Sequence, residues 1–198
     1  MKKQDTFTFN FYSNNYLSLI EQYDSIEPPL KSLFKKYIKP NYRVLDIGFG
    51  SGRDLKYIRD NLNADCYGVD SCREFVNYLK KDEYFKNRVF LGVLPDIGLY
   101  RNLKFNAILL IAVIMHLTKD KVELSIKNIR KILYDRGLVI ISYSTKPRDK
   151  DKRFFEDLRG NFIQKTFIKY GFELIEKKES FDSLKRGIEW RSEVYRKI

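Results

Sequence analysis

The sequence predicts an α/β domain in three layers, with helices on both faces of a mostly parallel sheet. Three observations predict it: an apolar segment that runs into closely spaced glycines (residues 44–52), an acid that ends the next apolar segment (Asp70), and strands that alternate with amphipathic helices. Open sheets of this kind bind nucleotides in the loops that follow their parallel strands. We therefore expect a ligand site at the carboxyl edge of the sheet.

Apolar spacing predicts the elements of the N-terminal half in order. Residues 14–38 carry apolar residues at helical intervals, with a break at Pro28–Pro29. Residues 53–63 form a second helix with one apolar face, between the apolar strands 43–47 and 65–69. The order of strand, glycine turn, helix, strand and acid is the first half of a Rossmann-like unit.

The same alternation continues through the C-terminal half. The long apolar run at 105–112 predicts a fully buried central strand. A polar connection between the last two strands favours antiparallel pairing. The remaining predicted elements are helices over 73–80, 119–134 and 154–170, and strands over 88–91, 137–143, 172–180 and 188–196. The expected fold is a Rossmann-like three-layer sandwich, whose mostly parallel sheet of about seven strands closes with an antiparallel C-terminal pair.

Length and composition fit one soluble domain spanning 1–198. Apolar residues make up 43% and charged residues 32% of the 198, as in ordinary globular proteins. The longest apolar run, 107–115, is about half of the ~20 residues that a membrane helix needs. Cys66 and Cys72 neither require a disulfide nor show metal-ligand spacing. We expect a cytoplasmic protein with no metal and no membrane partner.

The formal charge of +12 is compatible with a polyanionic partner, since net charge influences which molecules a protein associates with. However, the basic residues are scattered, and no block of five or six like charges appears. A nucleic-acid partner is therefore the weaker alternative, and the sequence indicates no particular oligomeric state.

The glycine spacing narrows the choice of ligand. A dinucleotide-binding turn requires G-x-G-x-x-G, but Arg53 stands where its third glycine belongs, and no Gly-Lys-Ser/Thr of a P-loop follows. The pattern of Asp46, Gly48, Gly50 and Gly52 is instead similar to motif I of the class I S-adenosylmethionine-dependent methyltransferases. The predicted order of strands extends this resemblance over nearly the whole chain, and it is closest to small methyltransferases that act on small molecules.

The resemblance implies a cofactor site for S-adenosylmethionine and its product S-adenosylhomocysteine. Asp46 and the loop glycines would meet the amino-acid end of the cofactor, and Asp70 would accept hydrogen bonds from the ribose. One departure concerns the adenine, because many relatives carry an acid where Val93 stands. The other implied contacts are Ser71 and Leu94 beside the adenine, Asp96 as its polar partner, Ala112 near the methionine moiety, and Tyr12 and Tyr23 closing over the cofactor from an N-terminal helical lid (1–40) on the core (41–198).

The acceptor side of the site is less legible. His116, the only histidine, follows the fourth strand and is the candidate for a catalytic base or a pocket-lining residue. The mixed-sign segment 146–153 favours a solvated loop, with Arg148 and Arg153 as the residues to test if the acceptor is anionic. Tyr143, Ser144 and Arg191 are weaker candidates, and Trp190 is expected to be a packing anchor.

Our hypothesis is a methyltransferase that modifies an oxygen, nitrogen or sulfur atom of a small molecule. An RNA or protein methyltransferase is the alternative within enzymes, and a contiguous basic face around the cofactor mouth would distinguish it. The alternative of another class is a catalytically silent protein that binds S-adenosylmethionine or scaffolds a partner.

Overall fold

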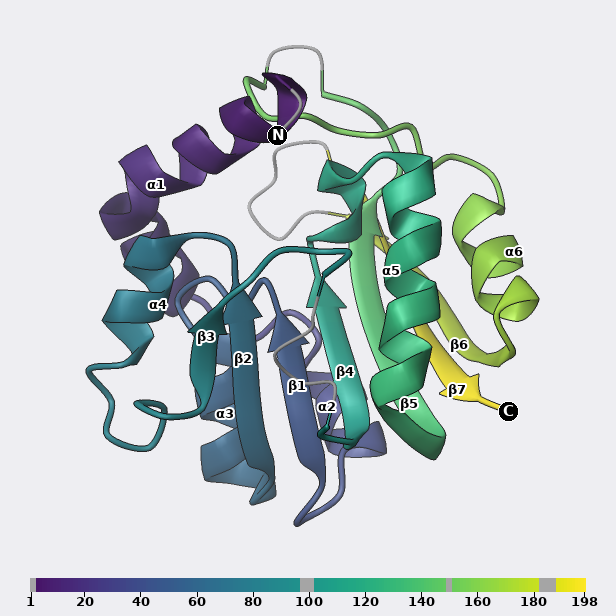
Figure 1. Ribbon diagram of the computed structural model, residues 1–198, viewed down its shortest axis with the longest axis horizontal. Helices are drawn as coiled ribbons and strands as arrows, with labels where there is room; N and C mark the ends of the chain where they lie inside the picture. The colour runs from purple at the N-terminus through teal and green to yellow at the C-terminus, as the bar shows by residue number, and fades with distance from the viewer. Residues whose placement is uncertain (1–2, 97–101, 149–150, 182–187) are drawn as a thin grey trace.

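A mixed sheet forms the centre of the structure (Figure 1). This computed structural model describes residues 3–96, 102–148, 151–181 and 188–198. Within them, the strands are β1 (Arg43–Ile47), β2 (Asp65–Asp70), β3 (Val89–Leu91), β4 (Phe105–Ile111), β5 (Leu133–Ser144), β6 (Phe172–Phe181) and β7 (Glu189–Lys197). They lie in the order β3-β2-β1-β4-β5-β7-β6. Strands β1 to β5 pair in parallel, and β7 pairs antiparallel with both β5 and β6, so the predicted fold class is confirmed.

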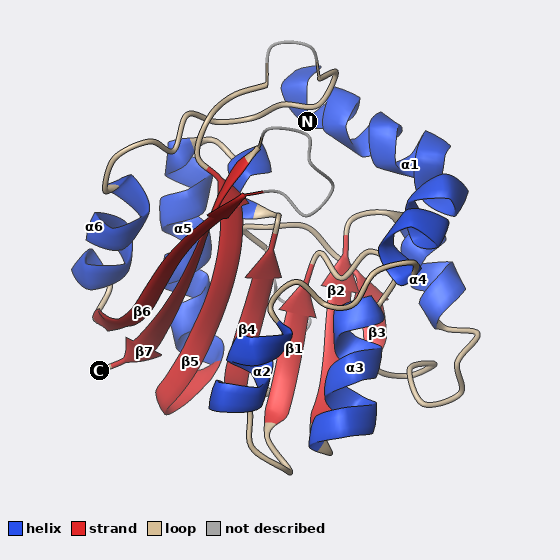
Figure 2. Ribbon diagram, turned by 180° about the vertical axis from the view of Figure 1, so that it is seen from behind, coloured by secondary structure: helices blue, strands red, loops and turns tan. Residues whose placement is uncertain are grey.

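Helices cover both faces of this sheet. They are α1 (Lys3–Asp24), α2 (Lys31–Tyr37), α3 (Arg53–Leu62), α4 (Arg73–Leu79), α5 (Lys119–Ile132) and α6 (Phe162–Lys169), with a short 3₁₀ helix, η2 (Ile114–His116). Helices α5 and α6 lie on one face, and α2 and α3 lie on the other (Figure 2). Each face has its own apolar core: α5 packs through Val122, Ile126 and Ile129, whereas α3 packs through Leu55 and Ile58. This division explains why the central strands are apolar on both faces.

The N-terminal helical prediction is wrong at its start. Helix α1 begins at Lys3, eleven residues before the predicted 14, although the predicted break at Pro28–Pro29 is confirmed, since α1 ends at Asp24 and α2 begins at Lys31. The first turns of α1 have exposed aromatic residues, such as Phe7 at 53%, and therefore lack the apolar stripe that predicts a helix. Their placement comes from contacts far along the chain, including the bond from the Phe154 N–H to the Thr8 hydroxyl, at 2.9 Å.

The predicted helix over 154–170 is wrong in its first eight residues. Helix α6 begins only at Phe162. Backbone N–H groups of the preceding segment donate hydrogen bonds to distant parts of the chain. The Glu156 N–H donates to the Met115 carbonyl at 2.8 Å, and the Leu158 N–H donates to the Thr145 carbonyl at 3.1 Å. These bonds replace the i to i−4 bonds of a helix, so apolar spacing alone misled the prediction.

Two features are absent from the residues that the structure describes. No helix there is both long enough and apolar enough to cross a membrane. The same part of the chain contains no group of three or more His, Cys, Asp or Glu side chains able to hold a metal ion.

Candidate active site

The glycine loop after β1 lies at the carboxyl edge of the sheet. Gly48, Gly50 and Gly52 all have positive φ, at 81°, 57° and 76°, a region in which L side chains are strained. A Cβ on Gly48 would lie 2.4 Å from a methyl carbon of Val113, which follows β4. Gly48 is therefore required both for its backbone conformation and for its packing against Val113, and a ligand at this edge would meet the main chain of Gly48 and Gly50.

Asp70, the last residue of β2, ties this loop to the neighbouring strand. Its carboxylate accepts a hydrogen bond from the Gly50 N–H at 2.9 Å and another from the Cys72 N–H at 2.8 Å. Burial raises the pKa of Asp70 to about 6, although these backbone donors oppose the shift. Each carboxylate oxygen has more than one lone pair, so the side chain retains capacity for a ligand hydroxyl.

Asp46 contributes a buried carboxylate that lacks a matched partner. It is 2% exposed, and its Oδ1 has no hydrogen-bond donor among the described residues. Burial, followed by the nearby Asp54 and Asp70 carboxylates, raises the pKa of Asp46 well above its ordinary value. Arg53 pairs with Asp54 at 2.7 Å. A buried, unpaired carboxylate is costly, and a cationic ligand would relieve that cost.

A cavity of about 840 Å³ extends from the glycine loop to His116, which follows β4. It brings most of the predicted site residues together: His116 and the cofactor candidates Tyr12, Tyr23, Asp46, Gly48, Gly50, Asp70, Ser71, Leu94 and Ala112 all line it. Gly52 and Asp96 are not among its lining residues. Gly52 instead faces the Leu79 side chain, and Asp96 is exposed beyond a tight turn in which it pairs with Val93.

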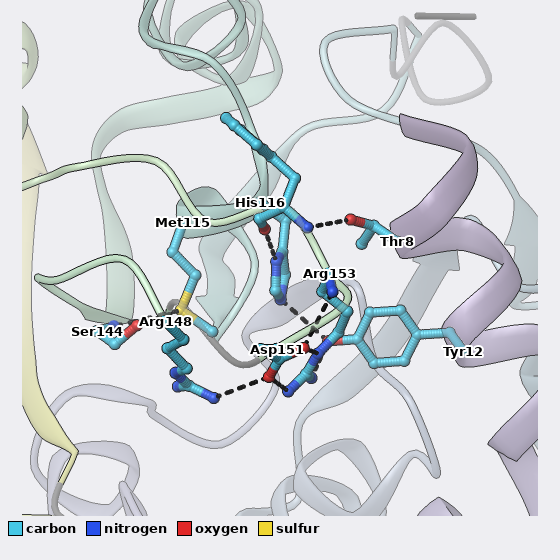
Figure 3. A network of polar contacts seen from close by, with 9 residues as sticks. Thr8, Tyr12, Met115, His116, Ser144, Arg148, Asp151 and Arg153 are labelled. Carbon is cyan, nitrogen blue, oxygen red and sulfur yellow. Dashed lines mark hydrogen bonds and ion pairs between the residues drawn. The ribbon is translucent and has the colours of Figure 1, made fainter. Parts of the chain in front are cut away.

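A hydrogen-bonded chain of Arg153, Tyr12 and His116 forms the opposite wall of the cavity, which we call the acceptor wall (Figure 3). The Arg153 guanidinium donates to the Tyr12 hydroxyl oxygen at 3.1 Å. That hydroxyl lies 3.0 Å from His116 Nε2, and His116 Nδ1 lies 2.7 Å from the Phe154 carbonyl oxygen. Because a carbonyl only accepts, Nδ1 carries the proton, and the Tyr12 O–H donates to Nε2.

His116 is consequently neutral in this arrangement. Burial is the main cause that lowers the pKa of His116, to about 4, and the nearby Arg153 acts in the same direction. Sequence reasoning placed Tyr12 with the cofactor and His116 with the acceptor; the structure makes them direct partners. Nothing in the sequence signals this pairing, since the two residues are 104 positions apart.

Replacing Tyr12 with phenylalanine should raise the pKa of His116 by about half a unit to one unit. The lost O–H bond to Nε2 stabilises only the neutral ring and is worth about 1 kcal/mol. The single histidine gives one assignable Hε1 resonance, which an NMR titration can follow. Tyr16→Phe, on the same helix, is the control and should leave that pKa unchanged. An unshifted pKa in Tyr12→Phe would contradict the hydrogen-bond chain.

The mixed-sign segment 146–153 is a solvated loop only in part where it is described: Lys146, Pro147 and Lys152 are exposed, but the other three side chains are not. The side chains of Arg148, Asp151 and Arg153 are only 17%, 18% and 13% exposed, and both arginines line the cavity. Alternating charge signs suggested solvation, but Arg148 and Arg153 pair with Asp151 in a wall of the cavity.

The other acceptor-side candidates divide between the cavity and the core. Trp190 lines the cavity instead of serving only as a packing anchor. Tyr143 is buried in the core at 1% exposure, and the Ser144 hydroxyl bonds to the Met115 sulfur at 3.3 Å. Arg191 pairs with Glu179 at 2.9 Å. Sequence reasoning missed other lining residues, among them Phe11, Phe75, Val113, Lys121 and Ser192, whose side chains come from elements that only the fold brings together.

Fold and site together define a protein of the doubly wound α/β class with a ligand cavity at the carboxyl edge of its sheet. Residues 20–176 match a family model described as a methyltransferase domain. The chain therefore belongs to the methyltransferase family, whose cofactor is S-adenosylmethionine. A search of curated proteins gave no match.

Solved structures share the fold at low sequence identity. A TehB-like S-adenosylmethionine-dependent methyltransferase from Corynebacterium glutamicum is 22% identical, over 96% of this chain and all of that one, with a TM-score of 0.70. The magnesium protoporphyrin IX methyltransferase of Synechocystis, solved with bound S-adenosylhomocysteine, is 12% identical over 99% and 100%, with a TM-score of 0.74. The cyclase SpnF is 12% identical over 85% and 79%, with a TM-score of 0.62. Neighbours with different reactions show that the fold alone does not fix the chemistry.

The residues at the acidic end of the cavity, where Asp46 and Asp70 lie beside the glycine loop, fit this cofactor. S-adenosylmethionine carries a sulfonium and an ammonium group, and the cavity offers the buried Asp46 carboxylate with its unpartnered oxygen. Gly48 and Gly50 line the cavity with main chain alone, and a Cβ at either position would meet the side chain of Val113 or Tyr23. The Asp46 carboxylate and the main chain of the glycine loop therefore agree with the family assignment.

Proposed function

We propose that this protein transfers a methyl group from S-adenosylmethionine to an oxygen, nitrogen or sulfur atom of a small molecule. One observation carries the proposal: a single cavity of about 840 Å³ connects the acidic glycine loop with the wall that contains His116. Sites for small ligands usually measure about 300–1,000 Å³. This cavity thus has room for the cofactor and a compact acceptor side by side.

The acidic end would hold the cofactor. Asp46 would pair with its ammonium group, and the Asp70 carboxylate would accept bonds from the ribose hydroxyls. Ser71 and Leu94 would border the adenine, with Asp96 reaching it only if the Val93–Asp96 turn moves. Ala112, in a left-handed conformation at φ 60°, would present its backbone to the methionine moiety; strained backbone is common at functional sites. When bound, the cofactor supplies a methyl carbon activated by the sulfonium charge.

Residues 1–40 would act as a lid on the core formed by 41–198, within one domain. Tyr12 contacts the acceptor wall through His116, and the Tyr23 ring lies 3.3 Å from where a Gly50 Cβ would stand. Ser51 in the glycine loop donates to Asp24, at the end of α1, at 2.6 Å. The lid therefore touches both ends of the cavity, an arrangement that excludes water and favours a small acceptor over a macromolecule.

His116 would serve the acceptor by way of Tyr12. Its Nε2 accepts a hydrogen bond from the Tyr12 O–H, so a proton that leaves the acceptor would pass to the Tyr12 oxygen while the Tyr12 proton moves to Nε2. The lowered pKa of His116, about 4, makes the ring a weak base. The wall thus favours acceptor atoms that need little deprotonation, such as an amine, a thiolate or a carboxylate. The two free, buried cysteines support a cytoplasmic setting for this reaction.

Titration with S-adenosylmethionine and S-adenosylhomocysteine tests the proposal. Either ligand at 100 times its dissociation constant should stabilise the fold by about 2.7 kcal/mol, measured as a thermal shift and confirmed by calorimetry. An absence of binding by both ligands would refute the enzyme and the silent-binder alternatives together. Binding without transfer to any of a broad panel of metabolites, nucleic acids and proteins would favour the silent binder.

A further inference from the structure

Two half-buried guanidinium groups share one carboxylate on the acceptor wall (Figure 3). Arg153 Nη2 lies 2.6 Å from Asp151 Oδ2, and Arg153 Nε lies 2.9 Å from Asp151 Oδ1. Arg148 Nη1 lies 3.9 Å from Asp151 Oδ2, which is a looser contact. Asp151 is thus held closely by Arg153, and the three side chains together carry one net positive charge.

Aromatic rings support both guanidinium groups. The Arg148 guanidinium carbon lies 4.3 Å from the centre of the Phe155 ring and 5.7 Å from that of Trp190. Arg153 lies 4.5 Å from the Phe11 ring centre. An arginine that stacks on aromatic rings keeps its N–H groups in a fixed plane, the geometry that suits a bidentate oxyanion.

The cavity is therefore polarised along its length. Its glycine-loop end carries the Asp46 and Asp70 carboxylates together with the Arg53–Asp54 ion pair, whereas Arg148, Arg153 and Lys121 line the other end. Opposite potentials at the two ends match a cationic cofactor on one side and an anionic acceptor on the other. Trp190 and Met115, which also line this end, provide apolar surface for the body of such an acceptor.

We propose that the methyl acceptor carries an oxyanion group, a carboxylate or a phosphate, which pairs with Arg148 beside Trp190. The inference rests on the proposed function, because it assigns the acceptor end of the same cavity. Arg153 is a positioning residue in this scheme: it holds Asp151 and the Tyr12 hydroxyl in place. Arg148, which stacks on Phe155 and lies beside Trp190 in the cavity lining, is the residue that meets the acceptor.

The single tryptophan gives a direct readout, because Trp190 lies at the proposed site. The full-length protein is first saturated with S-adenosylhomocysteine, and Trp190 emission is then followed during titration with benzoate, phenyl phosphate or the neutral isostere benzamide. We expect a saturable change with at least one of the two anions and binding of benzamide weaker by about tenfold or more, which corresponds to about 1.4 kcal/mol. The tighter of the two anions shows whether carboxylate or phosphate is preferred.

Two variants separate recognition from general charge. Arg148→Gln should weaken binding of the preferred anion by about tenfold or more and leave the affinity for S-adenosylhomocysteine within about threefold. Arg159→Gln removes an arginine that is 64% exposed and should change neither affinity.

Unaffected anion binding in Arg148→Gln, benzamide as tight as the anions, or no saturable binding by either anion would overturn the inference while leaving the proposed function intact. If Arg148→Gln does not fold, the comparison of anions with benzamide on the natural protein decides. Failure of S-adenosylhomocysteine to bind at the first step would instead refute the proposed function and this inference with it.

Discussion

Replacing Asp70 with alanine should weaken S-adenosylhomocysteine binding by about 100-fold or more, a loss of about 2.8 kcal/mol. The change removes the carboxylate proposed to accept the ribose hydroxyls, and hydrogen bonds to a charged group are worth about 1.5–3 kcal/mol each. It also leaves the Gly50 and Cys72 N–H groups without their present acceptor. The glycine loop would therefore lose both a ligand contact and its tie to β2.

Calorimetric titration of the purified variant measures this loss, with the midpoint of thermal unfolding as a check on folding. Asp120→Ala, which removes an exposed acid from the first turn of α5, is the matched control and should bind normally. Asp70→Asn keeps the shape but removes the charge, so its affinity should fall between those of the natural protein and Asp70→Ala. Normal binding by Asp70→Ala would show that the cofactor lies elsewhere.

The sheet could be predicted from sequence because its strands follow a local rule. The central strands β1 and β4 are apolar on both faces, and closely spaced glycines follow β1. The errors fall where bonds between distant segments replace the local pattern. The segment before α6 has the apolar spacing of a helix, yet its N–H groups bond to Met115 and Thr145.

The candidate site divides in the same way. Asp46, Gly48, Gly50 and Asp70 were predictable, because one strand–turn–helix–strand unit places them together. The opposite wall joins Tyr12 to Arg153, 141 positions away, and no local motif encodes that contact. Gly52 matched the motif but does not line the cavity, so a motif position does not by itself make a ligand contact.

Gly52→Ala should destabilise the fold by about 2–5 kcal/mol, because the motif needs this glycine for packing. Two effects add: an L residue in the left-handed region costs about 1–2 kcal/mol, and overpacking costs about 1–3 kcal/mol. The new Cβ would lie 2.6 Å and 2.7 Å from the two methyl carbons of Leu79, which is 1% exposed and fixed in the core. Urea unfolding measures the loss.

The chain contains a matched control for this prediction. Gly160 has φ 78°, against 76° for Gly52, but a Cβ there would meet no atom within 4 Å. Gly160→Ala therefore carries only the backbone strain of about 1–2 kcal/mol, and the difference between the two variants isolates the contact with Leu79. That contact would push the start of α3 away from α4 and disturb the nearby loop, so Gly52→Ala should also bind S-adenosylhomocysteine more weakly, whereas Gly160→Ala should not. Equal destabilisation by the two changes would mean that Leu79 moves aside freely, and the geometry of the loop would then depend on backbone conformation alone.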